Sequence, residues 1–266
     1  MKGLLGIEWL KIKRYRTFWV LVGLFALLLP VWNYEIASGF MQIGGNGKNG
    51  INFLDTAYSF PGVWGNIGFW GSIFVVFLSI LVIIITTNEY TYRTHRQNVL
   101  DGWQRMQFYN AKVLVVLMLA SAAALYLFIL GLIFGGINSG SLAGMFAGLE
   151  QVVYFFLLSL NYMGFALFIA IWIKRSGLAI GLFLLYAMII ENIARGIVNH
   201  FMDFPLANLL PLQASDELFP FPLMQMARSL MKAEPDISMP AYAIASVGWC
   251  LVYYLGSRTL LLKRDW

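Results

Sequence analysis

The sequence predicts an all-α, polytopic membrane protein with six transmembrane helices. Hydrophobic residues make up 60% of the 266 positions and charged residues only 12%, whereas soluble domains carry about 25% charged residues. Six apolar runs are long enough to cross roughly 30 Å of hydrocarbon. We expect these spans near residues 18–36, 67–87, 113–137, 152–173, 178–198 and 241–262. The spans and their connections occupy the chain, so we expect residues 1–266 to form a single transmembrane domain.

The segment before the first span, from Ile7 to Arg16, is basic and aromatic. This composition is typical of a helix that lies in the membrane interface, although its charges fall on more than one helical face. Its basic residues also interrupt any apolar core before a cleavage site, so we do not expect a cleavable signal peptide.

Basic residues predict the orientation, because cytoplasmic connections carry an excess of lysine and arginine. Fourteen of the 18 lysine and arginine residues fall on one side of the predicted spans. They are Lys2, Lys11, Lys13, Arg14, Arg16, Arg93, Arg96, Arg105, Lys112, Lys174, Arg175, Arg258, Lys263 and Arg264. We therefore expect a multi-pass protein of the cell (inner) membrane with both termini in the cytoplasm, as an even number of spans also requires. The net charge of +5 then reflects topology and contact with lipid headgroups, and no motif indicates nucleic acid as a partner.

The two connections on the opposite side differ in character. Residues 38–66 are rich in glycine and asparagine, whereas residues 199–240 mix acids and prolines with large apolar residues. The second composition predicts short helical pieces that lie at the outer interface or dip into it. The sequence leaves open whether this connection re-enters the membrane.

The connection between the second and third spans is polar, basic and longer than a turn requires. Thr94 and Gln97 fit a capping box, and Gly102 stands where a helix would end in a left-handed C-cap. The residues between them predict a short helix of roughly eight residues, about 12 Å long. At the end of the second span, Glu89 is either solvated or part of a salt bridge to the N-terminal helix or to a soluble partner.

Glu191 and Arg195 form a candidate pair inside the fifth span. Ionised residues at this depth are costly and usually face a partner or a water-filled cavity, and their i, i+4 spacing would let them pair on one helix face. We expect an ion pair near the outer mouth or a lining of a translocation path.

The chain has one cysteine, Cys250, and two distant histidines, His95 and His200, so we expect neither a disulfide nor a metal site. Five tryptophans lie near the ends of predicted spans, and this position predicts that they anchor the protein in the membrane interface: Trp19, Trp64, Trp70, Trp172 and Trp249.

With these features in view, the chain resembles the permease subunits of type-2 ABC transporters, the six-span exporter family, and in particular its bacterial branch. The resemblance rests on the basic N-terminus, the six spans, the large final outer connection and above all the residues after Glu89. There, a short coupling helix at 94–101 is followed by Gly102, Arg105, the pair Phe108-Tyr109 and Lys112. The chain departs from the family pattern at Trp103-Gln104, where small or proline residues are common.

The resemblance implies a subunit that is not itself an enzyme and has no cofactor of its own, since ATP and Mg²⁺ would be bound by a partner. No phosphate-binding loop of the form Gly-x-x-x-x-Gly-Lys-Ser/Thr occurs in the sequence. The implied partners are a cytoplasmic ABC ATPase and a second permease, in a homodimer or with a similar chain. The implied ATPase-coupling residues are Glu89, Arg93, Thr94, Arg96, Gln97, Asn98, Val99, Leu100, Gly102 and Arg105.

Two other classes of function stay open at this point. A protease-like intramembrane enzyme would need paired glutamates and further histidines, which Glu191, Arg195 and His200 match poorly. A membrane partner or sensor that transports nothing is the other alternative. The sequence does not identify the substrate, and it does not distinguish export from other work driven by ATP.

Overall fold

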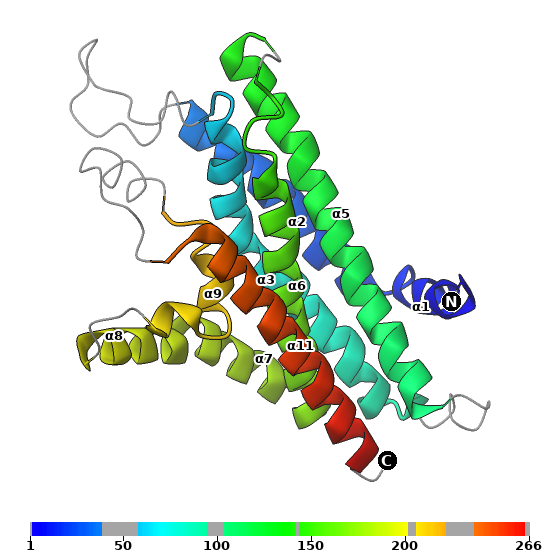
Figure 1. Ribbon diagram of the computed structural model, residues 1–266. Helices are drawn as coiled ribbons and strands as arrows, with labels where there is room; N and C mark the ends of the chain where they lie inside the picture. The colour runs from blue at the N-terminus through cyan, green and yellow to red at the C-terminus, as the bar shows by residue number, and fades with distance from the viewer. Residues whose placement is uncertain are drawn as a thin grey trace.

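The computed structural model describes residues 2–38, 58–94, 104–141, 144–201, 206–221 and 237–263. Within these ranges the chain is helical and contains no strand (Figure 1). The elements are α1 (Lys2–Ile12), α2 (Arg16–Ala37), α3 (Gly62–Thr91), α5 (Arg105–Ser139), α6 (Glu150–Ile173), α7 (Ser176–Leu185), the π-helical η1 (Tyr186–Ile190), α8 (Glu191–Phe201), the 3-10 turn η2 (Leu206–Leu209), α9 (Gln213–Asp216) and α11 (Met239–Lys263).

Six helices in these ranges are long and apolar enough to cross a membrane: α2, α3, α5, α6, the continuous stretch Ser176–Phe201 and α11. They confirm the six predicted spans. The helices α3 and α5 extend past the predicted boundaries, to Thr91 and from Arg105. Their polar ends project beyond the apolar runs because contacts described below support them.

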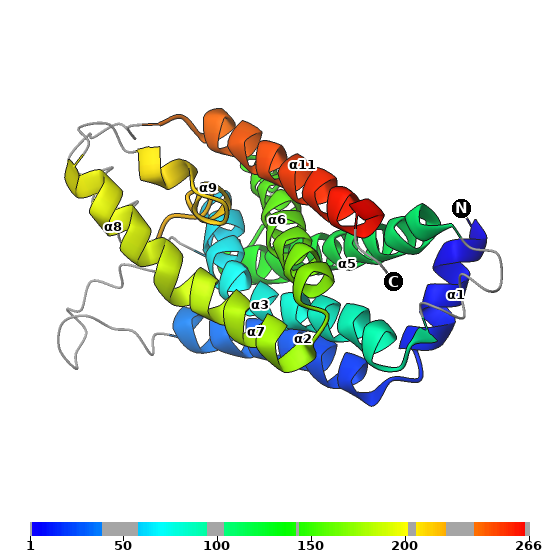
Figure 2. The ribbon, with the colours of Figure 1, turned by 90° about the horizontal axis from the view of Figure 1, so that it is seen from below.

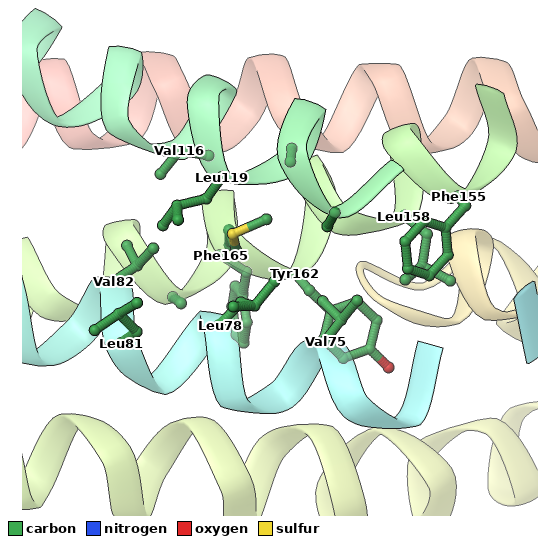
Figure 3. Close-up of a cluster of buried hydrophobic side chains, with 14 of the residues drawn as sticks. Val75, Leu78, Leu81, Val82, Val116, Leu119, Phe155, Leu158, Tyr162 and Phe165 are labelled. Atoms are coloured by element: carbon green, nitrogen blue, oxygen red, sulfur yellow. The ribbon is translucent and has the colours of Figure 1, made fainter. Parts of the chain in front are cut away.

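The helix α6 lies at the centre of the bundle, with α3, α5 and α11 around it (Figure 2). Side chains from three of these helices interlock along its length, as Figure 3 shows for Val75 and Leu78 of α3, Leu119 of α5, and Phe155 and Phe165 of α6. Between membrane helices, lipid is as apolar as leucine, so this interlocking stabilises the bundle through van der Waals contact and little through burial from water.

Two glycines of α5 make room for two aromatic rings at and just before the start of α3. A Cβ atom on Gly131 would lie 2.2 Å from the Trp64 ring, and one on Gly135 would lie 2.4 Å from the Phe60 ring. Trp64 is fully buried, stacks on Phe128, and its indole N–H donates to the carbonyl oxygen of Met145 at 3.1 Å. The prediction that Trp64 is an interface anchor is therefore wrong, because these partners bury the whole side chain.

The described part of the connection between the fifth and sixth spans, residues 206–221, packs inside the bundle. It contacts α6, α8 and α11, and its Leu212, Leu218 and Phe219 are buried. The Phe219 ring meets Phe155 edge to face, with the ring centroids 6.2 Å apart. The short helical pieces predicted for this connection are present as η2 and α9.

One end of the bundle holds the end of α3, the start of α5 and both chain termini, and we call it the basic end after its Lys11, Arg93, Arg105 and Lys174. There, α1 runs across the direction of α2 and α5 (Figure 1). The N-terminal segment is thus helical as predicted, and its place in the membrane interface stays a prediction. The predicted short coupling helix, 94–101, lies almost entirely outside the described residues.

The position of Phe219 yields a test of the packed connection. A Cβ atom on Gly68 of α3 would lie 2.1 Å from the Phe219 ring, so Gly68→Ala should displace that ring and cost about 1–3 kcal/mol through overpacking. The thermal unfolding temperature of the detergent-purified protein measures this loss. Gly65→Ala is the matched control, because nothing lies within 4 Å of a Cβ at Gly65. Equal unfolding temperatures for the two variants would contradict the packing of Phe219 on α3.

Candidate functional site

Four charged side chains from three helices meet at the basic end, and we call them the ion cluster: Glu8 and Lys11 of α1, Glu89 of α3 and Lys112 of α5. The Lys112 ammonium group donates to Glu8 Oε2 at 2.5 Å and also to Glu89 Oε1. Lys11 donates to Glu8 Oε1 at 3.1 Å and to Glu89 Oε1 at 3.3 Å. The cluster therefore joins α1, α3 and α5 through direct ion pairs.

The ion cluster is buried and balanced in charge. The side chains of Glu8, Lys112 and Glu89 are 1%, 2% and 8% exposed, and the two lysines offset the two glutamates. Burial costs an isolated charge several kcal/mol, which only well-formed pairs repay. Burial alone would raise the pKa of Glu8, but Lys112 and Lys11 hold it below its ordinary value. Burial alone would lower the pKa of Lys11, but Glu89 and Glu8 hold it above its ordinary value.

Helix geometry explains why these residues converge. Glu8 and Lys11 are three residues apart, so they share one face of α1. Glu89 lies in the last turn of α3, and Lys112 follows the start of α5 by two turns. The Lys112 ammonium also lies 5.6 Å from the centre of the Phe108 ring. The two helix ends that flank the connection at 92–104 are thus fixed to each other and to α1.

Local backbone geometry ends α3 and begins α5 on either side of that connection. The Tyr92 N–H donates to the Asn88 carbonyl at 2.9 Å, and Arg93 adopts a left-handed conformation with φ of 56° that turns the chain out of α3. At the start of α5, the Gln107 side chain accepts a hydrogen bond from the Gln104 N–H at 3.0 Å. A capped start of this kind fixes the first turn of a helix.

A cavity of 230 Å³ separates α1 from the end of α3 beside the ion cluster. Its lining includes Tyr15, Asn88 and Thr94. The Asn88 amide donates to the Tyr15 hydroxyl at 3.0 Å, and the Thr94 hydroxyl donates to the Glu89 carbonyl at 3.5 Å. The first residue of the predicted coupling helix therefore contacts the same wall as the cluster.

The structure places some of the predicted coupling residues and leaves others outside its description. Glu89 is buried in the ion cluster and bound to the N-terminal helix, so the solvated alternative for its carboxylate is wrong. Arg93 and Arg105 are exposed, and Thr94 is half-buried. The remaining predicted residues lie outside the described ranges: Arg96, Gln97, Asn98, Val99, Leu100 and Gly102.

Sequence reasoning missed three members of the cluster. We counted Lys11 only as a marker of orientation, we gave Lys112 that role and a place in the family resemblance but no partner, and we assigned Glu8 no role. A signal for Glu8 was present, because it is the one acidic residue before Glu35 in an otherwise basic N-terminus. Lys112 stands directly before an apolar run and after Phe108-Tyr109, and a lysine in such surroundings needs a buried partner.

The predicted pairing of Glu191 with Arg195 is wrong. Glu191 Oε1 accepts hydrogen bonds from the backbone N–H groups of Leu212 at 2.8 Å and Gln213 at 3.0 Å. Arg195 instead pairs with Glu217 and donates to Asn208 Oδ1 at 3.0 Å. Both side chains bind residues of the packed connection at 206–221, and neither binds the other. Whether they line a translocation path stays untested.

In the described ranges, no three His, Cys, Asp or Glu side chains lie close enough to hold a metal ion.

Removal of Lys112 should destabilise the protein strongly. Lys112→Met leaves Glu8 buried with only the half-exposed Lys11 as a partner, and breaking a buried ion pair from one side costs about 3–5 kcal/mol. The measurement is thermal unfolding in detergent. Glu8→Gln added to Lys112→Met should recover part of the loss, since Lys11 can then neutralise Glu89. Lys13→Met, at an exposed lysine, is the control, and an equal effect of Lys112→Met and Lys13→Met would contradict the cluster.

The stability that Glu8 contributes should depend on pH. Its pKa in the folded protein lies below the ordinary value of 4.5, so its ionised form stabilises the fold above pH 4.5. This contribution is lost as the pH falls through the folded pKa. The unfolding temperatures of the parent and Glu8→Gln should therefore differ most near neutral pH and converge as the pH falls below 4.5. A difference that stays constant down to acidic pH would show that the Glu8 charge has no stabilising role.

Comparison with known families covers the same helices that build the ion cluster. A family model described as "ABC-2 family transporter protein" matches residues 4–190, from α1 through η1. A comparison with curated proteins finds no match. The family match spans well over half of the chain and agrees with the six membrane-spanning helices. The chain therefore belongs to the ABC-2 transporter family, and it is a membrane-spanning permease of an ABC transporter.

Proposed function

We propose that this permease is the membrane subunit of an ABC exporter and that a separate cytoplasmic ATPase, which binds ATP and Mg²⁺, drives it. The observation that carries the proposal is the ion cluster, which joins α1, α3 and α5 directly beside the connection at 94–104. The basic end is then the cytoplasmic face of the cell membrane.

In this proposal the connection receives the movement of the ATPase, with its helix at 94–101 seated in a groove of that subunit. The flanking helix α3 ends two residues after Glu89, and α5 begins two turns before Lys112. A displacement of the connection reaches both helix ends together, because neither can move away from the other without separating buried charges. Helices held in this way transmit a rigid-body push better than a flexible loop.

The same ion pairs extend the movement to α1. Glu8 and Lys11 contact Glu89 or Lys112 directly, so a shift of α3 and α5 at the basic end pulls the N-terminal helix with it. In this way α1 becomes part of the moving unit, although it precedes the first span. Glu89 thus couples the ATPase contact to the N-terminal helix, which is one of the roles expected from the sequence.

A second permease, either another copy of this chain or a similar one, completes the transport path in this proposal. The fifth span supports it, because only 17% of its most apolar window is buried within the chain. Its exposed apolar residues include Leu185, Met188, Ile193 and Ile197. A second permease would cover part of this face, and lipid would cover the rest.

The division of labour between the two subunits can be tested by purification. The permease alone should not hydrolyse ATP, whereas the permease copurified with its ATPase should do so. The measurement is ATP turnover in detergent and in reconstituted vesicles, with an ATPase variant that lacks its catalytic glutamate as the control for contaminating activity. Hydrolysis by the isolated permease would overturn the proposed division.

The contact with the ATPase can be tested by reversing two charges, Arg96→Glu together with Arg105→Glu. Twelve other basic residues remain on the same side, so the topology should persist. The variant should, however, bind the ATPase more weakly, or ATP hydrolysis in the complex should no longer depend on transport. The matched control reverses two charges elsewhere at the basic end, Arg258→Glu with Lys263→Glu, and should keep the ATPase bound. Normal assembly and transport by the first variant would show that Arg96 and Arg105 only mark orientation.

A further inference from the structure

A groove of 280 Å³ lies between α5, α6 and α11. Its floor includes Val116, Leu160 and Gly164, and the outer part of its lining includes Leu117, Val247 and Leu251. These last three side chains are 39%, 47% and 57% exposed. The groove is therefore open to whatever surrounds the membrane-spanning helices.

The lining of this groove offers water few polar partners. Its side chains are aliphatic and aromatic apart from Cys250 and the tyrosine hydroxyls. Of these hydroxyls, that of Tyr109 donates to the Tyr254 carbonyl at 3.2 Å, whereas that of Tyr253 is buried without a hydrogen-bond partner among the described residues. A water molecule needs two to four polar partners, and an apolar cavity without them takes up apolar ligands instead.

The dimensions of the groove match one leaflet of a membrane. It begins at Tyr109 and Tyr254, near the basic end, and follows α6 from Leu167 back to Leu157. Ten residues of helix cover about 15 Å, which is half of the roughly 30 Å hydrocarbon thickness. An apolar channel of this length, open along the membrane-spanning helices, can accommodate the acyl chain of a lipid in one leaflet.

A basic side chain stands at the headgroup end of the groove. Arg258 follows Val247, Leu251 and Tyr254 at spacings of four, three and four residues, so it continues the same face of α11. It is exposed and lies beyond Tyr254 in the direction of the basic end. An arginine at this level pairs well with a lipid phosphate.

From these observations we infer that the groove between α5, α6 and α11 binds one acyl chain of a membrane phospholipid, with Arg258 facing its phosphate. The lipid comes from the leaflet at the basic end, which is the cytoplasmic leaflet under the orientation proposed above. It fills the gap between α5 and α11, which contact each other at Tyr109 and Tyr254. The site is independent of the ATPase contact, so it can be tested on the permease alone.

Filling the groove should expel the lipid. Gly164→Leu is suited to this because its Cβ would lie 3.5 Å from the Tyr253 ring, an ordinary contact, with the rest of the side chain in the groove. In native mass spectrometry with added dioleoylphosphatidylglycerol, the parent should retain phospholipid, and Gly164→Leu should lower the lipid-bound fraction about tenfold. Gly181→Leu is the matched control, because Gly181 is exposed on α7 and nothing lies within 4 Å of its Cβ. Equal retention by both variants would overturn the inference.

The single cysteine provides a second measurement of lipid in the groove. Cys250 lines the groove and is the one thiol in the sequence, so its alkylation by N-ethylmaleimide reports occupancy. Phospholipid added to the delipidated permease should slow the reaction. Dioleoylglycerol has the two acyl chains without the phosphate. In the parent it should slow the alkylation less than the phospholipid does, whereas in Arg258→Gln the two lipids should slow it equally. Two results would overturn the inference. One is an alkylation rate that lipid does not change, and the other is slow alkylation that arises only when the permease dimerises without lipid, because each would show that lipid does not occupy the groove.

Discussion

Lys112 places an ammonium group where α1, α3 and α5 meet, and the arrangement of the basic end depends on how its charge is neutralised. One glutamate would suffice to balance it, but the cluster uses Glu8 and Glu89 together with Lys11. The second glutamate brings in a third helix, and Lys11 restores neutrality. The stability gained over a well-packed apolar contact is small or negative for such buried pairs. What the pairs provide is a fixed register, because a shift of one helix would leave a buried charge without its partner.

The middle of the bundle uses polar contacts in a similar way, with the connection at 206–221 at their centre. Asn161 and Tyr162 of α6 donate to the Pro211 carbonyl at 2.8 Å and to Asp216 at 2.8 Å. Trp249 of α11 donates to the Leu209 carbonyl at 2.8 Å, and Arg195 of α8 pairs with Glu217. One short segment therefore satisfies polar side chains of three helices.

The sequence predicts the spans well because the signal for each one is local. A run of about twenty apolar residues is read directly, as for α6, whose predicted start and end differ from the helix by at most two residues. The ion cluster could not be predicted, since Glu8, Glu89 and Lys112 are far apart in the sequence and only tertiary packing sets the register of α1 against α3. The pairing of Glu191 with Arg195 failed for a related reason. Spacing of i, i+4 permits a contact, but it does not show that backbone N–H groups from a distant segment compete for the same carboxylate. Trp64 shows the same limit, because its position near a span end does not reveal the glycine that accommodates its ring.

The two sets of polar contacts divide six of the helices into two groups that different forces hold together. Charges join α1, α3 and α5 at the basic end, whereas hydrogen bonds through residues 206–221 join α6, α8 and α11 farther along the bundle. Between the groups, contact is mainly apolar, as in the interlocking side chains of α3, α5 and α6 (Figure 3). Tyr109 adds a hydrogen bond to the Tyr254 carbonyl at 3.2 Å, and Lys174 lies over the Tyr90 ring at 5.3 Å. Apolar contact also fixes one group against the other, because a Cβ atom on Gly71 of α3 would lie 2.8 Å from the Phe155 ring of α6, and one on Gly68 would lie 2.1 Å from the Phe219 ring. A change within either group would break buried ion pairs or hydrogen bonds, and sliding between the groups would displace these rings from the glycines that accommodate them. We therefore expect a push at the basic end to move α3, α5 and α6 together.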